Sequence, residues 1–287
     1  MRFIFVKYHK KKYPEDITPD LVEVAGHFDK DKIDDVENYS LHTEYSYGKR
    51  KFSSELIKKY PELCEANKKE IPQLWKSKKW AEEFAHFVFD LTLNHTAPKV
   101  LEIHPPFSDY CNLEQFIERY STFEKIIHDK YPNTEIVIEN RTGSRYSGGS
   151  FIICQAEEIA LLCKIILETN TKLGVVLDFP QLLTAEKINT EAFDCDTYFK
   201  AIDTIYPYQK AIKGIHVWGK KKNAKGHWVA HSGTLDTYIT DPEDKNAFLK
   251  GIYKICSGNQ KRFFVPEVNS NTSDLEAIVN DIRGILK

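Results

Sequence analysis

The sequence predicts a (β/α)8 barrel, with a single domain spanning residues 1–287. From residue 99 onward, short apolar runs alternate with stretches of helical periodicity, which is typical of parallel strands joined by helices. A chain of 287 residues is also of the right length for one such barrel. No GxGxxG motif follows a strand, and its absence favours a closed barrel over an open dinucleotide-binding sheet.

The first 98 residues are the irregular part of the predicted barrel. Residues 2–8 and 39–42 are expected to be strands. Residues 21–25 (LVEVA) fit either a strand, which would complete the eight, or the body of a helix. Residues 44–70 predict a long loop or a short helix over the barrel mouth. An amphipathic helix is then predicted by apolar residues at helical spacing, namely Trp80, Phe84, Phe87, Val88 and Leu91.

Five further strands alternate with helices in the rest of the chain. One helix begins at Asn112, with Gln115 placed as its capping partner. Asp241 and Pro242 open another, because proline is favoured at the first helical position. We expect Ser273 to cap the last helix. The predicted strands are 100–104, 135–139, 173–178, 212–216 and 262–267.

Composition narrows the class of protein. A formal charge of −2 argues against coating of nucleic acid by bulk electrostatics, but it leaves room for a locally basic cleft. The six cysteines form no CxxC pair, which indicates reduced thiols in a cytoplasmic protein. The N-terminal apolar run is too short for a signal peptide, and no stretch reaches 18 apolar residues. We therefore expect a cytoplasmic protein with no membrane partner, and we infer no obligate protein partner.

Four acidic or imidazole side chains stand at the ends of four separate apolar runs. They are Glu139, Asp178, His216 and Glu267, spaced 38 to 51 residues apart. A polar residue at one strand end often marks only the point where the chain reaches solvent. In a parallel barrel, however, successive strands bring their carboxyl ends to one rim, where such enzymes carry their chemistry. Carboxylates and imidazole together suit a divalent metal, with Zn²⁺ the first expectation and Mn²⁺, Co²⁺ or Fe²⁺ as alternatives.

Further histidines extend this predicted metal site. His104 ends the run VLEIH, His42 follows YSL, and His231 lies after a basic loop. Imidazole is a common ligand of zinc. We therefore add these three histidines to the candidate ligands.

These motifs resemble the endonuclease IV branch of the xylose-isomerase-like TIM barrels. The segment IENRTGSRYSGG is similar to that family's Ile-Glu-Asn-Thr-Ala-Gly, and LGVVLDFPQ to its Asp-Thr-Cys-His segment. GIHVWGKKK resembles its His-Leu-Asn-Asp segment, PEVN its Glu-Thr-Ile-Asn, and HPPFSDY its His-Pro-Gly. The resemblance runs from about residue 99 to the C-terminus.

The resemblance implies a ligand set position by position. Family members that cleave DNA at abasic sites hold three zinc ions, two of them bridged by the glutamate that matches Glu139. The partners of that glutamate at one ion match Asp178, His216 and Glu267, and its partners at the second ion match His104 and His42. The third ion needs a histidine where this chain has Gln181, and an Asp-x-His pair where it has only His227 and His231. Because glutamine is a poor zinc ligand, this departure favours one or two ions.

The number of ions separates the candidate functions. With two or three ions, the resemblance implies hydrolysis of a phosphodiester, with abasic DNA as one candidate substrate and Glu139 and Glu267 as the catalytic carboxylates. With one ion, the site would resemble the sugar or sugar-phosphate isomerases and epimerases of the superfamily, in which a carboxylate moves a proton. A barrel that binds a ligand without catalysis is the third alternative.

Side chains near the predicted rim suit an anionic small-molecule or nucleic-acid substrate. Arg141 stands two residues after Glu139 and could pair with a phosphate, unless it makes only a surface salt bridge. A run of lysines that includes Lys220 follows His216, although such runs are often simply solvated. Trp218 could stack on a base or a sugar, or serve only in packing. The full set of expected substrate contacts is Arg141, Gln181, Trp218, Lys220 and His227.

Overall fold

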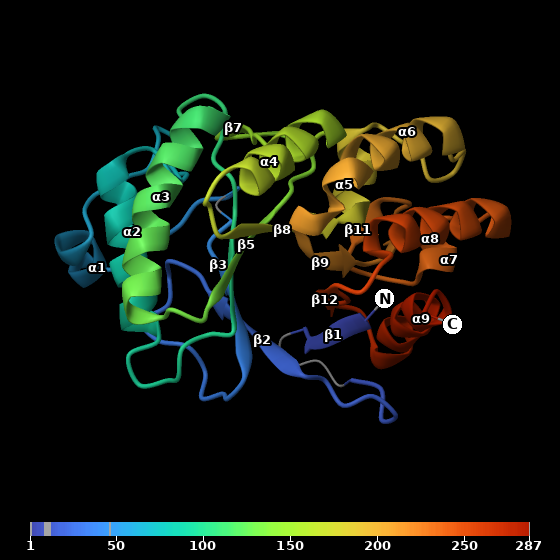
Figure 1. Cartoon of the computed structure of the whole chain (residues 1–287), viewed down its shortest axis with the longest axis horizontal. Helices are drawn as coiled ribbons and strands as arrows, with labels where there is room; N and C mark the ends of the chain where they lie inside the picture. The colour runs from blue at the N-terminus through green and yellow to red at the C-terminus, as the bar shows by residue number, and fades with distance from the viewer. Residues whose placement is uncertain (1, 9–12, 46, 287) are drawn as a thin grey trace.

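Eight parallel strands form a closed barrel in the computed structural model, which describes residues 2–8, 13–45 and 47–286. The first and last strands, from opposite ends of the chain, lie side by side (Figure 1). Residues 21–25 are therefore a strand and not a helix, and the predicted barrel is confirmed. Around the barrel the strands are β1 Arg2–Lys7, β12 Lys261–Pro266, β9 Ile212–Val217, β8 Leu173–Asp178, β5 Glu135–Glu139, β4 Val100–Ile103, β3 Tyr39–Thr43 and β2 Leu21–Gly26.

Helices cover the barrel from the third strand onward (Figure 1). Asn112 and Gln115 form the predicted capping box, and Asp241 caps its helix as expected. The predicted cap of the last helix is wrong, because Oδ1 of Asn271 rather than Ser273 accepts the first free N–H, from Asp274, at 2.8 Å. The helices are α1 Ser54–Lys59, α2 Lys78–Leu91, α3 Leu113–Lys130, α4 Ala156–Glu168, α5 Phe179–Ala185, α6 Cys195–Ile205, the 3-10 helix Tyr206–Ala211, α7 Leu235–Tyr238, α8 Pro242–Cys256 and α9 Thr272–Gly284.

The first two strand connections differ from the others. Residues 27–38, between β2 and β3, contain no helix, and neither does the described part of the connection from β1 to β2. These segments form the irregular N-terminal region that the sequence predicts. None of the described helices combines the length and the apolar character needed to cross a membrane.

Two short hairpins lie at the rim where the barrel strands end. After β5 come β6 Arg145–Tyr146 and β7 Gly149–Ser150, and after β9 come β10 Lys220–Lys222 and β11 Trp228–Ala230. Both pairs are antiparallel. They extend the loops that surround the mouth of the barrel.

The barrel interior changes from apolar to polar along the strands. Since side chains alternate between the two faces of a strand, the residue two positions before an inward acid also points inward. These positions hold valines that form a small internal cluster. Each valine precedes one strand-end acid, Val137 before Glu139, Val176 before Asp178 and Val265 before Glu267. The acids therefore stand on an apolar floor.

Candidate metal centre

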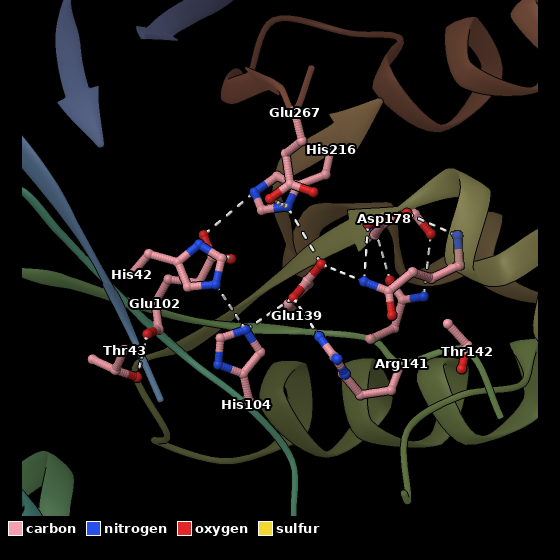
Figure 2. Close-up of polar contacts among 12 residues, drawn as sticks. His42, Thr43, Glu102, His104, Glu139, Arg141, Thr142, Asp178, His216 and Glu267 are labelled. Atoms are coloured by element: carbon pink, nitrogen blue, oxygen red, sulfur yellow. Dashed lines mark hydrogen bonds and ion pairs between the residues drawn. The ribbon is translucent and has the colours of Figure 1, made fainter. Parts of the chain in front are cut away.

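The carboxylate of Glu139 lies at the centre of a buried polar cluster at the ends of the strands (Figure 2). Its Oε2 is 2.9 Å from Nε2 of His104 and 3.2 Å from Nη1 of Arg141. Its Oε1 is 3.4 Å from Nδ1 of His216. The side chain is only 2% exposed, so its charge must be balanced by neighbouring groups and not by water. Glu139 is thereby shared between two sets of potential ligands.

The first set comes from β3, β4 and β5. Nε2 of His42 and Nε2 of His104 face each other at 3.1 Å, with their rings stacked at a centroid distance of 4.8 Å. The ligand atoms of His42, Glu102, His104 and Glu139 all lie within 4.8 Å of one another. Two imidazole nitrogens and a carboxylate oxygen at these separations could hold one metal ion.

The second set comes from β5, β8, β9 and the residue after β12. Nδ1 of His216 is 3.2 Å from Oε1 of Glu267, and β8 pairs with β9 so that Asp178 stands beside His216. The ligand atoms of Glu139, Asp178, His216 and Glu267 also lie within 4.8 Å of one another. The convergence expected of the four strand-end residues is therefore present, and Figure 2 shows Asp178 and the His42–His104 pair on opposite sides of Glu139.

Asp178 combines two roles because it ends β8 and caps α5. Its Oδ1 accepts the backbone N–H of Gln181 at 2.8 Å. Its Oδ2 accepts Nε1–H of Trp218 at 2.7 Å and the side-chain amide of Gln181 at 2.9 Å. The same amide donates to Oε1 of Glu139 at 2.6 Å. Gln181 thus holds together two carboxylates that would otherwise repel each other.

Two further buried glutamates belong to the cluster, and neither was expected from the sequence. Oε2 of Glu102 lies 3.4 Å from Nε2 of His216, and Oε1 of Glu23 lies 3.4 Å from Nδ1 of His42. Glu102 precedes His104 by two residues and so shares its inward face. Glu23 interrupts the apolar run LVEVA. A carboxylate inside an apolar run is therefore the sequence signal for such residues. The rule that site residues stand at strand ends does not detect it.

Burial and neighbouring carboxylates act in opposite directions on the pKa values of the three histidines, and the balance differs among them. Burial alone lowers the pKa of a histidine, but the charges of Glu23 and Glu102 raise the pKa of His42 to about 10. For His216 the charges of Glu102 and Glu267 likewise outweigh burial, and its pKa lies well above the ordinary value. For His104 burial prevails and lowers the pKa, although Glu139 opposes the shift.

His104 gives the most direct reason to expect a cation here. Its Nδ1 lies 3.2 Å from the backbone carbonyl of Glu44, which can only accept, so this contact assigns the ring proton to Nδ1. The lone pair of Nε2 then faces the Glu139 carboxylate at 2.9 Å. Two acceptors at that distance repel each other unless a positive charge lies between them. A divalent metal fits this place, since a hydrogen bond on Nδ1 is the usual way to orient a ligating histidine.

Buried atoms of the cluster that make no hydrogen bond also indicate a place for a cation. Among the described residues, both ring nitrogens of His216, Nδ1 of His42 and Oε1 of Glu102 make no hydrogen bond. Buried polar atoms without a hydrogen bond are rare in folded proteins, and a cation between these ring nitrogens and carboxylates would satisfy them. The donor set is one that zinc and similar ions accept, so the residues fit the metal that the sequence predicts.

A hollow of about 440 Å³ opens above the cluster. Arg141 lies on its wall, only 7% exposed, with Nε unpartnered and its guanidinium 5.9 Å from the ring centre of Tyr45. It is therefore not a surface salt bridge but a buried cation on the path to Glu139. Tyr47 and Tyr146, whose ring centres are 5.5 Å apart, border the same opening.

The remaining predicted residues differ in how close they come to the cluster. Nδ1 of His231 is 3.5 Å from Oε2 of Glu267, but its side chain is 30% exposed and joins neither ligand set. Trp218 stacks on His231 at a centroid distance of 4.2 Å and borders the hollow. Lys220 lies behind Trp218, at 5.3 Å from its ring centre. His227 is exposed in the turn between β10 and β11 and is not brought to the hollow.

Comparisons with known proteins support the fold but not a function. No protein-family model and no curated protein matches the sequence. The solved structure described as AsfvAP:AG is similar with a TM-score of 0.57 at 12% identity, covering 100% of this chain and 99% of that chain. The GH53 catalytic domain of Ignisphaera aggregans gives a TM-score of 0.37 at 12% identity, covering 92% and 73%, which is too weak for any inference. The first likeness supports the barrel alone.

Proposed function

We propose that this chain is a metal-dependent phosphodiester hydrolase of the endonuclease IV-like kind, with two divalent ions, zinc first among them. The observation that carries the proposal is the position of Glu139, whose two carboxylate oxygens face different ligand sets. A carboxylate shared in this way is suited to bridge two ions. An isomerase with one ion would have no use for the first set, which contains His42 and His104.

Each ion would have its own protein ligands. His42 and His104 would hold one ion together with Glu139. Asp178, His216 and Glu267 would hold the other, again with Glu139. His231 then stands beside Glu267 as a neighbour and not as a ligand.

Electrostatics support two ions and not three. The cluster contains five buried carboxylates, those of Glu23, Glu102, Glu139, Asp178 and Glu267. Among the described residues, the guanidinium that contacts these carboxylates is that of Arg141, through Glu139. With metal bound the ligating histidines are neutral, so five carboxylates and one guanidinium carry a formal charge of −4, which two divalent cations would cancel. Buried charges that are balanced in this way avoid most of the cost of desolvation.

The protein's own residues position the substrate. The guanidinium of Arg141 lies between the hollow and Glu139, where it would pair with a phosphate oxygen of the substrate. The apolar floor of valines and the buried walls keep water from spreading through the site. Bound ions would supply Lewis-acid polarisation of the phosphodiester and would lower the pKa of the attacking water. Trp218 and Gln181 hold Asp178 in a fixed orientation through their N–H groups.

Cleavage of defined substrates tests this proposal. Zinc-loaded protein should cut a duplex that contains one abasic site, and Glu139→Gln should reduce the rate by at least about a hundredfold, as expected when a group that orders the reacting centre is lost. Glu135→Gln, at the opposite end of the same strand, is the matched control and should retain activity. If neither abasic DNA nor a simple phosphodiester is cut, the hydrolase proposal fails. Turnover of a sugar phosphate with one ion bound would identify the isomerase instead.

A further inference from the structure

A second hollow, of about 300 Å³, lies outside the metal centre beside the β10–β11 hairpin. Its walls come from the end of α5 and the segment that follows, from both strands of the hairpin, and from α7. This volume lies at the lower end of the range for small-molecule sites. The side chains used below are Thr184, Lys187, Lys220, Trp228 and Tyr238.

One indole ring separates this hollow from the metal centre. Trp218 donates through Nε1 to Oδ2 of Asp178 on one side. On its other side, Nζ of Lys220 is 5.3 Å from the Trp218 ring centre and 5.0 Å from that of Tyr238. Lys220 also lines the second hollow. Trp218, which lines the hollow above the metal centre, contacts Lys220, which lines the second hollow, so the two hollows are neighbours.

The chemistry of the hollow suits an anion joined to a planar ring. Lys187 and Lys220 supply two amines, and no carboxylate is among its described lining residues. Trp228 and Tyr238 supply aromatic surfaces whose ring centres are 6.3 Å apart, and Trp228 is 38% exposed. Lysine amines bind phosphates, and exposed indole rings stack on nucleobases of any sequence.

Local structure explains why these groups meet. Helix α5 ends in a turn in which Ile188 N–H donates to the carbonyl of Leu183 at 2.9 Å and Lys187 takes a left-handed backbone with φ of 58°. This turn places Lys187 at the edge of the hollow. Pairing of β10 with β11 sets Trp228 opposite Lys222, whose amine lies 5.0 Å from the indole centre.

We propose that the second hollow binds the nucleotide adjacent to the phosphodiester held at the metal centre, with its phosphate at Lys187 and Lys220 and its base on Trp228. This inference rests on the proposed function and narrows its substrate to a polynucleotide strand. Of the basic residues after β9, Lys220 takes part, together with Lys187 from the turn after α5.

Equilibrium binding to the full-length, metal-loaded chain tests the proposal. The probe is a fluorescein-labelled single-stranded DNA of eight nucleotides with a central abasic site, in which a hydrolysis-resistant phosphonate replaces the phosphodiester beside that site. Fluorescence anisotropy measures its binding. Trp228→Ala should weaken binding about 5- to 100-fold, the usual effect of losing one stacked base. Lys187→Ala should lower the slope of log affinity against log salt by about 0.7, as expected for one lost phosphate contact on a single strand.

A similar hollow elsewhere on the barrel provides matched controls. Lys250 and Tyr253 line a hollow of about 400 Å³ between α8 and α9. Lys250→Ala and Tyr253→Ala remove the same types of group and should leave both affinity and salt slope unchanged. Circular dichroism of all four variants checks that they fold.

Each result decides the inference independently of turnover. Absence of DNA binding by the wild type, or equal affinity for wild type and Trp228→Ala, overturns it. Loss of affinity in Lys187→Ala alone would mark the hollow as a simple anion site and also overturns it. Hydrolysis of methyl p-nitrophenyl phosphate is measured in parallel because it needs the metal centre and not the second hollow. Failure of both that reaction and cleavage of abasic DNA refutes the proposed function, whereas the binding comparison tests the second hollow in either case.

Discussion

Oε2 of Glu102 lies 3.4 Å from Nε2 of His216, on the side of the imidazole ring opposite Glu139 and Glu267. The ring therefore has carboxylates on both sides. If Nδ1 ligates an ion, Nε2–H points at Glu102 and fixes the orientation of the ring. Glu23 stands in the same relation to His42, at 3.4 Å from Nδ1, while Nε2 of His42 faces His104.

Glu102→Gln should weaken zinc binding about 10- to 100-fold, because a carboxylate behind a ligating histidine makes the ring a better ligand. Zinc affinity is measured by competition with a chromophoric chelator. Glu135→Gln makes the same change in a strand but outside the cluster and should leave the affinity unchanged. Unaltered affinity in Glu102→Gln would mean that Glu102 does not position His216.

Gln181→Met should destabilise the metal-free protein by about 1 to 3 kcal/mol, because Glu139 and Asp178 lose a shared amide donor while they stay buried. Bound ions neutralise both carboxylates, so the loss should shrink in the metal-loaded protein. Urea unfolding with and without zinc measures the difference. Gln260→Met is the control. The side-chain amide of Gln260 donates to backbone carbonyls outside the metal centre, so the stability lost in this variant should be the same with and without zinc. A loss of equal size in both metal states of Gln181→Met would contradict the role given to its amide.

Arg141→Ala should lower kcat/KM for a phosphodiester about 10- to 100-fold, as expected when a charge-assisted hydrogen bond to a phosphate is lost. Zinc content should stay the same, since Arg141 contacts Glu139 but is not a ligand. Arg141→Lys should recover only part of the rate, because an ammonium cannot make the bidentate contact. Full activity in Arg141→Ala would remove Arg141 from the proposed substrate contacts.

Stability of the metal-free protein should fall as the pH rises from about 6.5 toward 10. The pKa of His42 is raised from 6.5 to about 10 in the folded state, so its contribution is complete below pH 6.5 and is lost as the pH passes through 10. One proton held in this way changes the free energy of unfolding by up to about 1.4 kcal/mol per pH unit. Thermal unfolding in a chelator between pH 6.5 and 9.5 measures the slope. His42→Gln should flatten the slope, and an unchanged slope would show that His42 is not the responsible group.

The regular part of the fold and the main ligands follow from local pattern. Apolar alternation fixes which strand residues face inward, and parallel strands bring their ends to one rim, so the convergence of Glu139, Asp178 and His216 could be expected. The segment LVEVA could not be assigned, because five residues are too few to separate strand from helix by periodicity. Its neighbours in the barrel decide it, since β2 pairs with both β1 and β3.

Other features depend on contacts that no local pattern encodes. Asn271 and Ser273 both suit the start of the last helix, and only the backbone geometry selects Asn271. The loop after His216 folds as a hairpin, so His227 faces solvent while His231 reaches Glu267. The role of Gln181 as a donor to two carboxylates requires α5 to begin at the end of β8, with Asp178 as its cap.

The zinc content of the purified full-length chain tests the shared position of Glu139 most directly. After equilibration with a buffered excess of zinc and gel filtration, elemental analysis should return two ions per wild-type chain and less than one per Glu139→Gln chain, because both ligand sets include this carboxylate. A single ion in the wild type, or the same content in both proteins, would contradict a two-ion centre bridged by Glu139.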